Sequence, residues 1–142
     1  MADQERFVHA VHIVARALGR ISRERARTAD VTPQQAETLQ LIFERGAVST
    51  SSLAEQLGID PSTASRNLTG LERSGLISRK KGADDARQTD VRLTPRGKRI
   101  AEAVSSGSND AIAALFEQLP RPERQRVADA LEILARIVDA TE

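Results

Sequence analysis

The sequence has no cysteine, tryptophan or tyrosine, and it has only three phenylalanines among 142 residues. Without cysteine the chain forms no disulfide, offers no thiolate ligand to a metal and carries no thiol-based redox switch. With so few aromatic rings, stacking on single-stranded DNA or on looped RNA is disfavoured. Because hydrophobic residues still make up 39% of the chain, we expect one domain with a modest, aliphatic core.

Long apolar runs are missing too. No run of about 18 apolar residues occurs, and no charged segment is followed by the apolar stretch of a signal peptide. We therefore expect no membrane span and a cytoplasmic location.

Signatures of catalysis are also absent. The chain has no glycine-rich phosphate loop, no nucleophile elbow and no His-Glu helix motif, so we expect neither an enzyme nor a cofactor. The two histidines, His9 and His12, could help to bind a divalent metal with a carboxylate from elsewhere. Nearby acids complete no clear site with them, so we interpret the pair as packing or plain surface and expect no metal.

The net charge of +1 conceals a strong segregation of charge along the chain. Residues 60–99 hold ten Lys or Arg against five Asp or Glu, a net of +5. Residues 1–59 are balanced at seven against seven, and residues 100–142 have four against eight, a net of −4. A basic patch on an otherwise neutral chain is what steering toward phosphates requires.

The middle of the chain has the pattern of two short helices joined by a turn. Ser49 can cap a helix over residues 49–57, which Gly58 ends. A second helix begins at Asp60, whose carboxylate is expected to accept from the free amides of the first turn, and runs to about Arg73. The spacing predicts a helix-turn-helix.

The second of these helices has one apolar and one small, polar face. Its apolar positions are Ala64, Leu68 and Leu71. The opposite side carries Ser62, Ser65, Arg66 and Thr69. Short hydroxyls let a helix approach base edges closely, and arginine can bond two guanine acceptors at once. Arg66 is therefore the first candidate for base readout, although an ordinary solvent-exposed face would have the same composition.

A basic hairpin follows. Gly75 stops the helix, residues 76–81 and 89–93 form two strands, and residues 82–88 form the tip. Five cations lie on this small element, which indicates phosphate contact: Arg79, Lys80, Lys81, Arg87 and Arg92. A solvated charged loop is the alternative.

At the tip, Arg87 is suited to enter the narrow, electronegative minor groove, and Asp85 could hold its guanidinium in position. The candidate DNA-contacting residues are Ser49, Ser62, Thr63, Ser65, Arg66, Thr69, Arg73, Arg79, Lys80, Lys81, Asp85 and Arg87.

These motifs, in this order, resemble the MarR family of bacterial transcriptional regulators. The resemblance rests on residues 53–66, 71–79, 85–87 and 93–97 and covers nearly the whole chain in length and element order. It implies a dimeric, mostly helical repressor or activator whose two winged lobes straddle a pseudo-palindromic operator in double-stranded DNA. It also implies a small-molecule effector cleft, for which the plausible lining residues are His9, His12, Arg16, Gln40 and Phe43.

The two ends of the chain are expected to build a homodimer. An apolar stripe in the first helix has the alternating spacing of a helix-packing seam: Phe7, Val11, Val14, Leu18 and Ile21. The last helix, around residues 127–138, is apolar over more than one side, which favours packing on a second copy. Packing within the chain, against a helix over residues 95–119, is the alternative. The poor helix formers in residues 105–110 predict a kink or break near Gly107.

The sequence therefore predicts a mainly α fold with a small β-wing, a winged helix-turn-helix with N- and C-terminal dimerisation helices. Residues 1–142 form one MarR-like domain, with the DNA lobe at 32–99 and dimerisation helices at 1–30 and 100–142. We expect a sequence-specific regulator, a repressor modulated by a small molecule. The alternatives are an architectural or nucleoid-associated dimer with little sequence preference, and a module that serves protein interaction alone.

Overall fold

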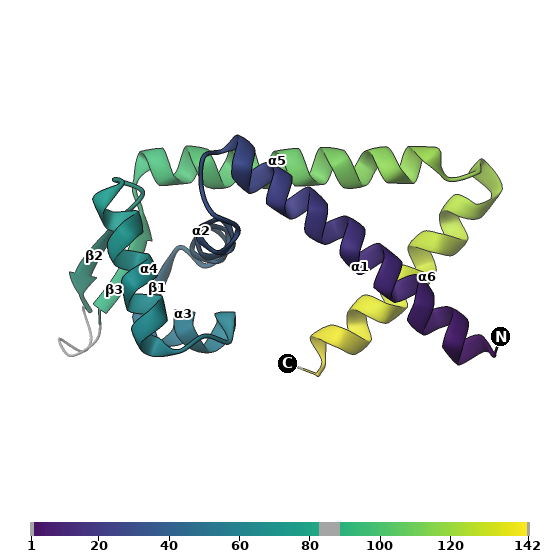
Figure 1. Ribbon diagram of the computed structural model, residues 1–142, viewed down its shortest axis with the longest axis horizontal. Helices are drawn as coiled ribbons and strands as arrows, with labels where there is room; N and C mark the ends of the chain where they lie inside the picture. Colours follow the sequence, from purple (N-terminus) through teal and green to yellow (C-terminus); the bar gives the residue numbers. More distant parts are fainter. Residues whose placement is uncertain (1, 83–88, 142) are drawn as a thin grey trace. The chain divides into compact units, whose positions relative to one another are not determined.

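The computed structural model of the protein describes residues 2–82 and 89–141. Helices and a small sheet alternate as the sequence predicts (Figure 1). The helices are α1 (Asp3–Thr28), α2 (Pro33–Arg45), α3 (Thr50–Leu57), α4 (Pro61–Arg73), α5 (Pro95–Gln118) and α6 (Arg121–Asp139). The strands are β1 (Ala47–Ser49), β2 (Ile77–Lys81) and β3 (Thr89–Leu93). The predicted fold class, mainly α with a β-wing, is confirmed.

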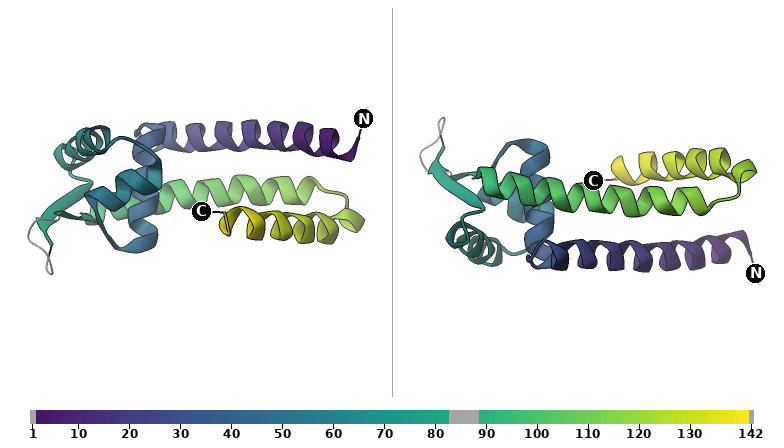
Figure 2. Two further views of the ribbon diagram at one scale, coloured as in Figure 1. Left: turned by 90° about the horizontal axis from the view of Figure 1, so that it is seen from below. Right: turned by 90° about the horizontal axis from the view of Figure 1, so that it is seen from above.

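Contacts within the chain divide it into two compact units, Met1–Ser108 and Asn109–Glu142. The first unit holds α1 to α4, the sheet and the first part of α5, and the second holds the rest of α5 and α6. Within the first unit, Figure 2 shows α1 as a long helix that extends beyond the cluster of α2, α3, α4 and the sheet. No helix within the described residues is long and apolar enough to cross a membrane.

The helix boundaries follow from capping residues. At the start of α2, the Thr32 hydroxyl accepts from the Gln35 amide at 3.1 Å while the Gln35 side chain accepts from the Thr32 amide at 3.0 Å. Ser49 caps α3 through the Ser52 amide. After α3 and α4 the chain reverses through Gly58 and Gly75, whose φ angles of 63° and 73° are readily adopted only by glycine.

The sheet is antiparallel with strand order β1-β3-β2, so the returning strand of the wing lies in the middle. Val48 in β1 pairs with Val91 in β3, and Arg79 in β2 pairs with the same valine from the other side. Val48 thus belongs to a third strand beside the two strands of the wing. Val91 is fully buried and fixes the face of the sheet that packs on the helices.

The main core of the first unit is aliphatic, as the scarcity of aromatic residues requires. Its buried members come from α2 to α5 and all three strands: Leu39, Ile42, Val48, Leu53, Leu68, Leu71, Leu76, Ile77, Val91 and Ala101. The apolar face predicted for α4 is therefore confirmed. Phe43, which follows Ile42 in α2, is 36% exposed, because Leu39 and Ile42 already fill the core side of that helix.

The start of α5 is fixed tightly to the turn that follows α4. The Thr94 hydroxyl donates to the carbonyl of Gly75 at 2.6 Å and accepts from the Gly97 amide at 3.1 Å, so it also caps α5. At Gly97 a Cβ atom would lie 1.9 Å from the carbonyl oxygen of Leu76. Only glycine allows the helix to approach the end of this turn so closely.

Helix α5 is continuous from Pro95 to Gln118, so the predicted break near Gly107 is wrong, whereas the alternative of a kink stays a prediction. A Cβ atom at Gly107 would lie 2.7 Å from Cδ of Arg25, whose side chain packs against α5 from α1. The glycine therefore makes room for a neighbouring helix instead of ending its own. Tertiary packing of this kind overrides weak helix propensity.

Helix α1 carries its predicted apolar stripe on the outside of the first unit. Phe7, Val11, Val14 and Leu18 are 38–54% exposed. Near its other end, Ala26 is buried with Ala36 and Val104 in a small second cluster. The helix is thus attached to the lobe at one end and leaves an apolar surface along the rest.

The second unit is a helical hairpin. The Arg124 guanidinium donates to the carbonyls of Leu119 and Glu117 at 3.1 and 2.9 Å, and it lies 5.3 Å from the centre of the Phe116 ring. In α6, Leu131, Ile133, Ile137 and Val138 are 53–61% exposed, and no residue of the helix is buried. The apolar side chains of α6 are therefore not explained by burial within the single chain.

Candidate nucleic-acid interface

Helix α4 presents the face that the sequence predicted. Ala64, Leu68 and Leu71 are at most 2% exposed and anchor the helix in the core. Pro61 begins the helix and Asp60 is its N-cap residue, but the Asp60 carboxylate accepts no backbone amide. It accepts the Ser62 hydroxyl instead. The predicted capping bond is therefore wrong, because a nearer donor uses the carboxylate.

The solvent side of α4 is polar and short. Ser62, Ser65 and Arg66 are exposed, whereas Thr63 and Thr69 are partly buried. The Arg66 guanidinium lies 3.4 Å from the Thr63 hydroxyl, a weak contact that leaves the arginine reaching into solvent. The Thr69 hydroxyl donates to the Ser65 carbonyl at 2.9 Å, so its proton is already used within the helix.

Two other candidates lie at the borders of this face. Arg73 is exposed at the last turn of α4. Ser49 is partly buried, and its hydroxyl caps α3 and lies 3.4 Å from the Ser51 hydroxyl. Its main role in the structure is thus to start α3, the helix that precedes the turn into α4.

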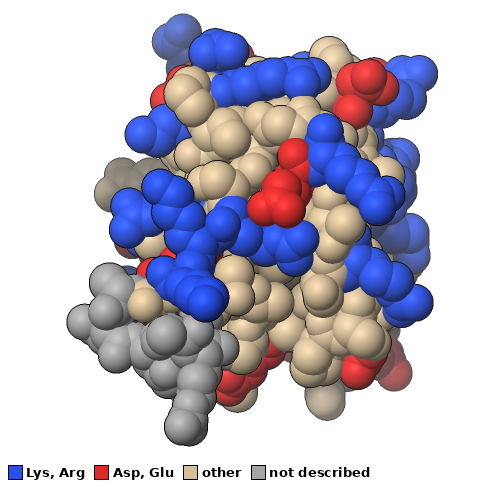
Figure 3. Space-filling model, turned by 90° about the vertical axis from the view of Figure 1, so that its left-hand side faces the viewer, with Lys and Arg blue, Asp and Glu red and all other residues tan. Residues whose placement is uncertain are grey.

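The described strands of the wing are basic. Lys80, Lys81 and Arg92 are exposed. Figure 3 looks toward the end of the molecule formed by α4 and the wing, where blue Lys and Arg side chains predominate over red Asp and Glu. The predicted wing tip, with Asp85 and Arg87, lies outside the described residues.

Arg79 differs from the other wing cations because its side chain turns back onto α4. It donates from Nη2 to Oε1 of Glu72 at 3.1 Å and from Nε to Oε2 at 3.4 Å, a two-point ion pair. Nη2 also donates to the Thr69 hydroxyl at 3.2 Å. The hydrogen bonds from Arg79 lower the pKa of Glu72 below its ordinary value. The ion pair therefore contributes fully to the stability of the fold at pH values above the ordinary pKa of glutamate. This contribution is lost as the pH falls through the lowered pKa of Glu72.

The sequence did not predict two polar links, one between α4 and α2 and the other between α2 and α5. The Asn67 amide of α4 donates to the Thr38 hydroxyl of α2 at 2.9 Å, and Thr38 is only 1% exposed. The Gln40 amide of α2 donates to the Ala101 carbonyl of α5 at 2.6 Å. The sequence signal for such a link was a threonine beside the apolar positions of α2, because a polar side chain that becomes buried needs a hydrogen-bond partner.

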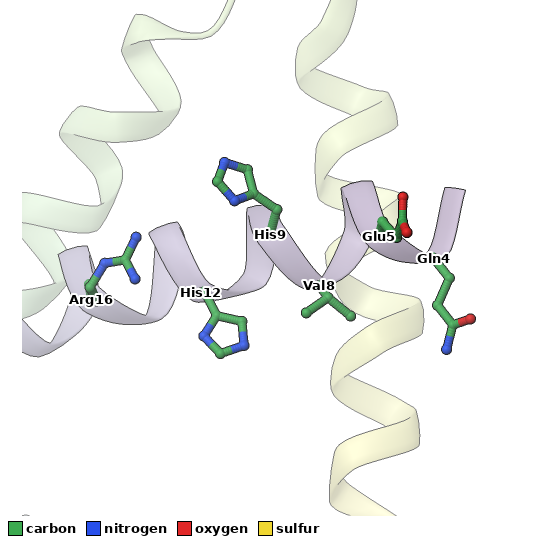
Figure 4. A pocket seen from close by; sticks show the side chains of 6 residues that line it. All are labelled: Gln4, Glu5, Val8, His9, His12 and Arg16. Atoms are coloured by element: carbon green, nitrogen blue, oxygen red, sulfur yellow. The ribbon is translucent and has the colours of Figure 1, made fainter. Parts of the chain in front are cut away.

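The five predicted effector residues do not form one site. His9, His12 and Arg16 line a pocket of about 610 Å³ together with Gln4, Glu5 and Val8 of the same helix. Figure 4 shows the side chains of His9 and His12 leaving α1 in different directions. Gln40 and Phe43 are not among the lining residues: Gln40 is bonded to α5, and Phe43 lies on the surface of α2. Within residues 2–82 and 89–141 no three His, Asp or Glu side chains group as a metal site would require.

Comparison with known proteins adds the following. The sequence profile of the MarR family matches residues 31–89, which run from the start of α2 to the returning strand of the wing. The chain is 32% identical over 112 residues to the HTH-type transcriptional regulator FarR of Neisseria gonorrhoeae, covering 79% of this chain and 77% of the relative. It is 30% identical over 112 residues to the transcriptional repressor MdtR of Bacillus subtilis, covering 79% and 70%.

A solved structure shows the same fold over the full length. FabT of Streptococcus pneumoniae, crystallised in complex with DNA, superposes with a TM-score of 0.83 over 99% of this chain and 100% of its own, at 19% identity. The order of helices, the capped helix-turn-helix and the three-stranded wing are thus accompanied by direct sequence similarity to named regulators. The chain belongs to the MarR family of helix-turn-helix transcriptional regulators.

Proposed function

We propose that the protein is a homodimeric, sequence-specific duplex-DNA-binding regulator that represses transcription and responds to a small molecule. The observation that carries the proposal is the exposed polar face of α4, with Arg66 reaching into solvent, next to a wing with exposed cations at Lys80, Lys81 and Arg92. One element is shaped for base edges and the other is charged for phosphates. Such a protein acts by binding and needs no catalytic group.

The manner of binding follows from the shape of the lobe. Helix α4 is held from behind by core side chains and from one side by the Asn67 bond to Thr38, so its polar face can enter a major groove as a rigid unit. Lys80 and Lys81 on the adjoining strand are then placed to meet phosphates beside the groove. Arg87 remains the sequence-based candidate for the neighbouring minor groove.

The dimer is supported by the unused apolar faces. Four aliphatic side chains of α6 and a stripe on α1 are exposed in the single chain, and contiguous exposed apolar faces mark protein–protein contacts. We assign residues 32–99 to DNA binding and residues 1–30 and 100–142 to dimerisation. In a two-fold dimer the recognition helices would meet two half-sites about one DNA turn, roughly 34 Å, apart.

Repression and effector response rest on the name of a relative and on a pocket along α1. MdtR, to which the chain is similar, is named a repressor, and a dimer on an operator would block access to a promoter. The α1 pocket, lined by His9, His12, Arg16 and Glu5, offers charged and hydrogen-bonding groups to a small polar molecule. The cytoplasmic location expected from the sequence stays a prediction.

Arg66→Ala tests the assignment of the reading face. If Arg66 bonds a guanine with two donors, its loss should weaken operator binding by about 1–3 kcal/mol and relax the preference at one base position. Titration of the variant against operators changed one base pair at a time measures both effects. A matched control is Arg6→Ala, which removes the same charge from an exposed side chain in the first turn of α1. Equal loss on every duplex would instead make Arg66 a phosphate contact.

A further inference from the structure

One guanidinium connects the wing to the recognition helix. Arg79 belongs to β2 in the stem of the wing, and among the described residues its side chain bonds to α4, twice to Glu72 and once to Thr69. Helix α4 is the element proposed to read the major groove, and β2 leads to the proposed minor-groove and phosphate contacts. The bonds of Arg79 therefore join two parts that must meet different places on the same DNA.

Arg79 is partly buried and ion-paired, whereas a cation available to bind phosphate would be exposed and unpaired. Its side chain is only 23% exposed, and Glu72 is 42% exposed. Among residues 77–82 and 89–93, Arg79 is the one cation with an ion pair, while Lys80, Lys81 and Arg92 extend into solvent. A phosphate contact at Arg79 would have to compete with the Glu72 carboxylate, whose negative charge also repels the DNA.

Thr69 gives the Arg79 side chain a second point of attachment on α4. Its hydroxyl donates to the Ser65 carbonyl and accepts from Arg79, so both partners fix its position. The planar fork of arginine holds Glu72 and Thr69, one turn of α4 apart, at defined angles, which a single-point cation could not do. The wing stem is thus aligned along the last turns of α4.

We propose that Arg79 is a positioning residue: through Glu72 and Thr69 it sets the angle between the wing and α4, so that both contact one operator in register. This inference rests on the proposed DNA-binding function and deepens it. It predicts that the ion pair contributes to specific binding, where both contacts must fit at once, and little to non-specific binding, where they need not.

Glu72→Gln separates this role from a direct phosphate contact, because the two roles predict opposite signs. If Arg79 positions the wing, loss of the two-point ion pair should lower the ratio of specific to non-specific affinity by about tenfold. If Arg79 contacts phosphate, removal of the competing carboxylate should raise affinity for every duplex. Titrations of the full-length variant against an operator and a scrambled duplex, at one salt concentration, give the ratio.

Arg79→Lys provides the second arm. Lysine keeps the charge but lacks the fork, so it should preserve a phosphate contact and fail to preserve a positioning role. We expect Arg79→Lys to lower the specificity ratio as much as Arg79→Ala, with a salt dependence of operator binding that is unchanged in both. Lys80→Ala, at the exposed neighbouring position, is the control: it should reduce the salt slope by about one and leave the ratio intact.

Melting temperatures of all variants complete the experiment. An unchanged melting temperature together with a reduced ratio of specific to non-specific affinity supports the positioning role of Arg79. The inference is overturned by a Glu72→Gln ratio equal to or above that of the wild type, by wild-type behaviour of Arg79→Lys, or by a ratio that falls only in proportion to lost stability. A wild-type chain that shows no preference for any operator would contradict the proposed function itself, and the positioning role with it.

Discussion

Replacing Gly97 with alanine is expected to destabilise the DNA lobe by about 3 kcal/mol or more, at the upper end of the range for overpacked sites. The new methyl group would lie 1.9 Å from the carbonyl oxygen of Leu76 and 2.9 Å from its carbonyl carbon. Both are backbone atoms, so no side-chain rotation relieves the clash, and α5 must shift away from β2. Chemical denaturation measures the loss, which should lower the melting temperature by on the order of 10 °C.

Gly70→Ala is the matched control for this prediction. Gly70 lies inside α4, and the nearest atom that a new Cβ atom would meet is Nε2 of Gln35 at 3.9 Å, an ordinary contact. Alanine is the better helix former, so this variant should be as stable as the wild type or more stable by up to about 1 kcal/mol. If Gly97→Ala were as stable as Gly70→Ala, the close approach of α5 to the end of this turn would be wrong.

The double substitution Leu131→Asp with Leu134→Asp is expected to abolish the dimer and, with it, most operator affinity. Leu131 is 56% exposed in the single chain and Leu134 is partly buried, so two aspartates there would disturb a monomer little. In a dimer they would bury unpaired charges at a cost of several kcal/mol. A monomer keeps only one lobe and loses the gain from tethering two half-sites.

Sedimentation and operator titration of the same samples test both steps of that prediction. Gln125→Asp, which adds an acid to the polar side of α6, should remain dimeric and bind DNA normally. A double mutant that stays dimeric would move the interface away from this face of α6. A wild-type monomer that binds its operator tightly would contradict the proposed assembly.

The elements predicted correctly from the sequence are those with local signals. The cap of α3 depends on Ser49, whose hydroxyl accepts from the Ser52 amide three residues later. Gly58 and Gly75 follow their helices directly and take the left-handed conformation that ends them. Such signals can be recognised in a short window because the interacting groups are near neighbours in the chain.

The features that were missed depend on contacts between distant segments. Gly97 is required by Leu76, and Gly107 makes room for Arg25, 82 positions earlier in the numbering. From the sequence, Gly107 and its neighbours indicate only a weak helix. The bond from Gln40 to α5 also joins residues 61 positions apart, and nothing in a local pattern identifies its acceptor.

The candidate site shows the same division. The polar face of α4 follows from helical periodicity, and Arg66 could be identified from it. The periodicity did not predict that Arg79 would form an ion pair with Glu72, or that the Thr69 hydroxyl would donate its hydrogen bond within its own helix. Residue type and spacing predicted which side chains share a face, but the choice between a free and an engaged side chain depends on packing.

The central claim, that the protein reads specific duplex DNA, is tested most directly by the ratio of two affinities of the purified wild-type chain. A duplex selected from a random pool by the protein is titrated beside a scrambled duplex of equal length at the same salt concentration, because phosphate contacts make any single affinity dependent on salt. We predict a ratio of about 10³ or more in favour of the selected duplex. A ratio near one would indicate an architectural DNA-binding protein, and no salt-dependent binding to either duplex would indicate a protein-interaction module; either result would contradict the claim.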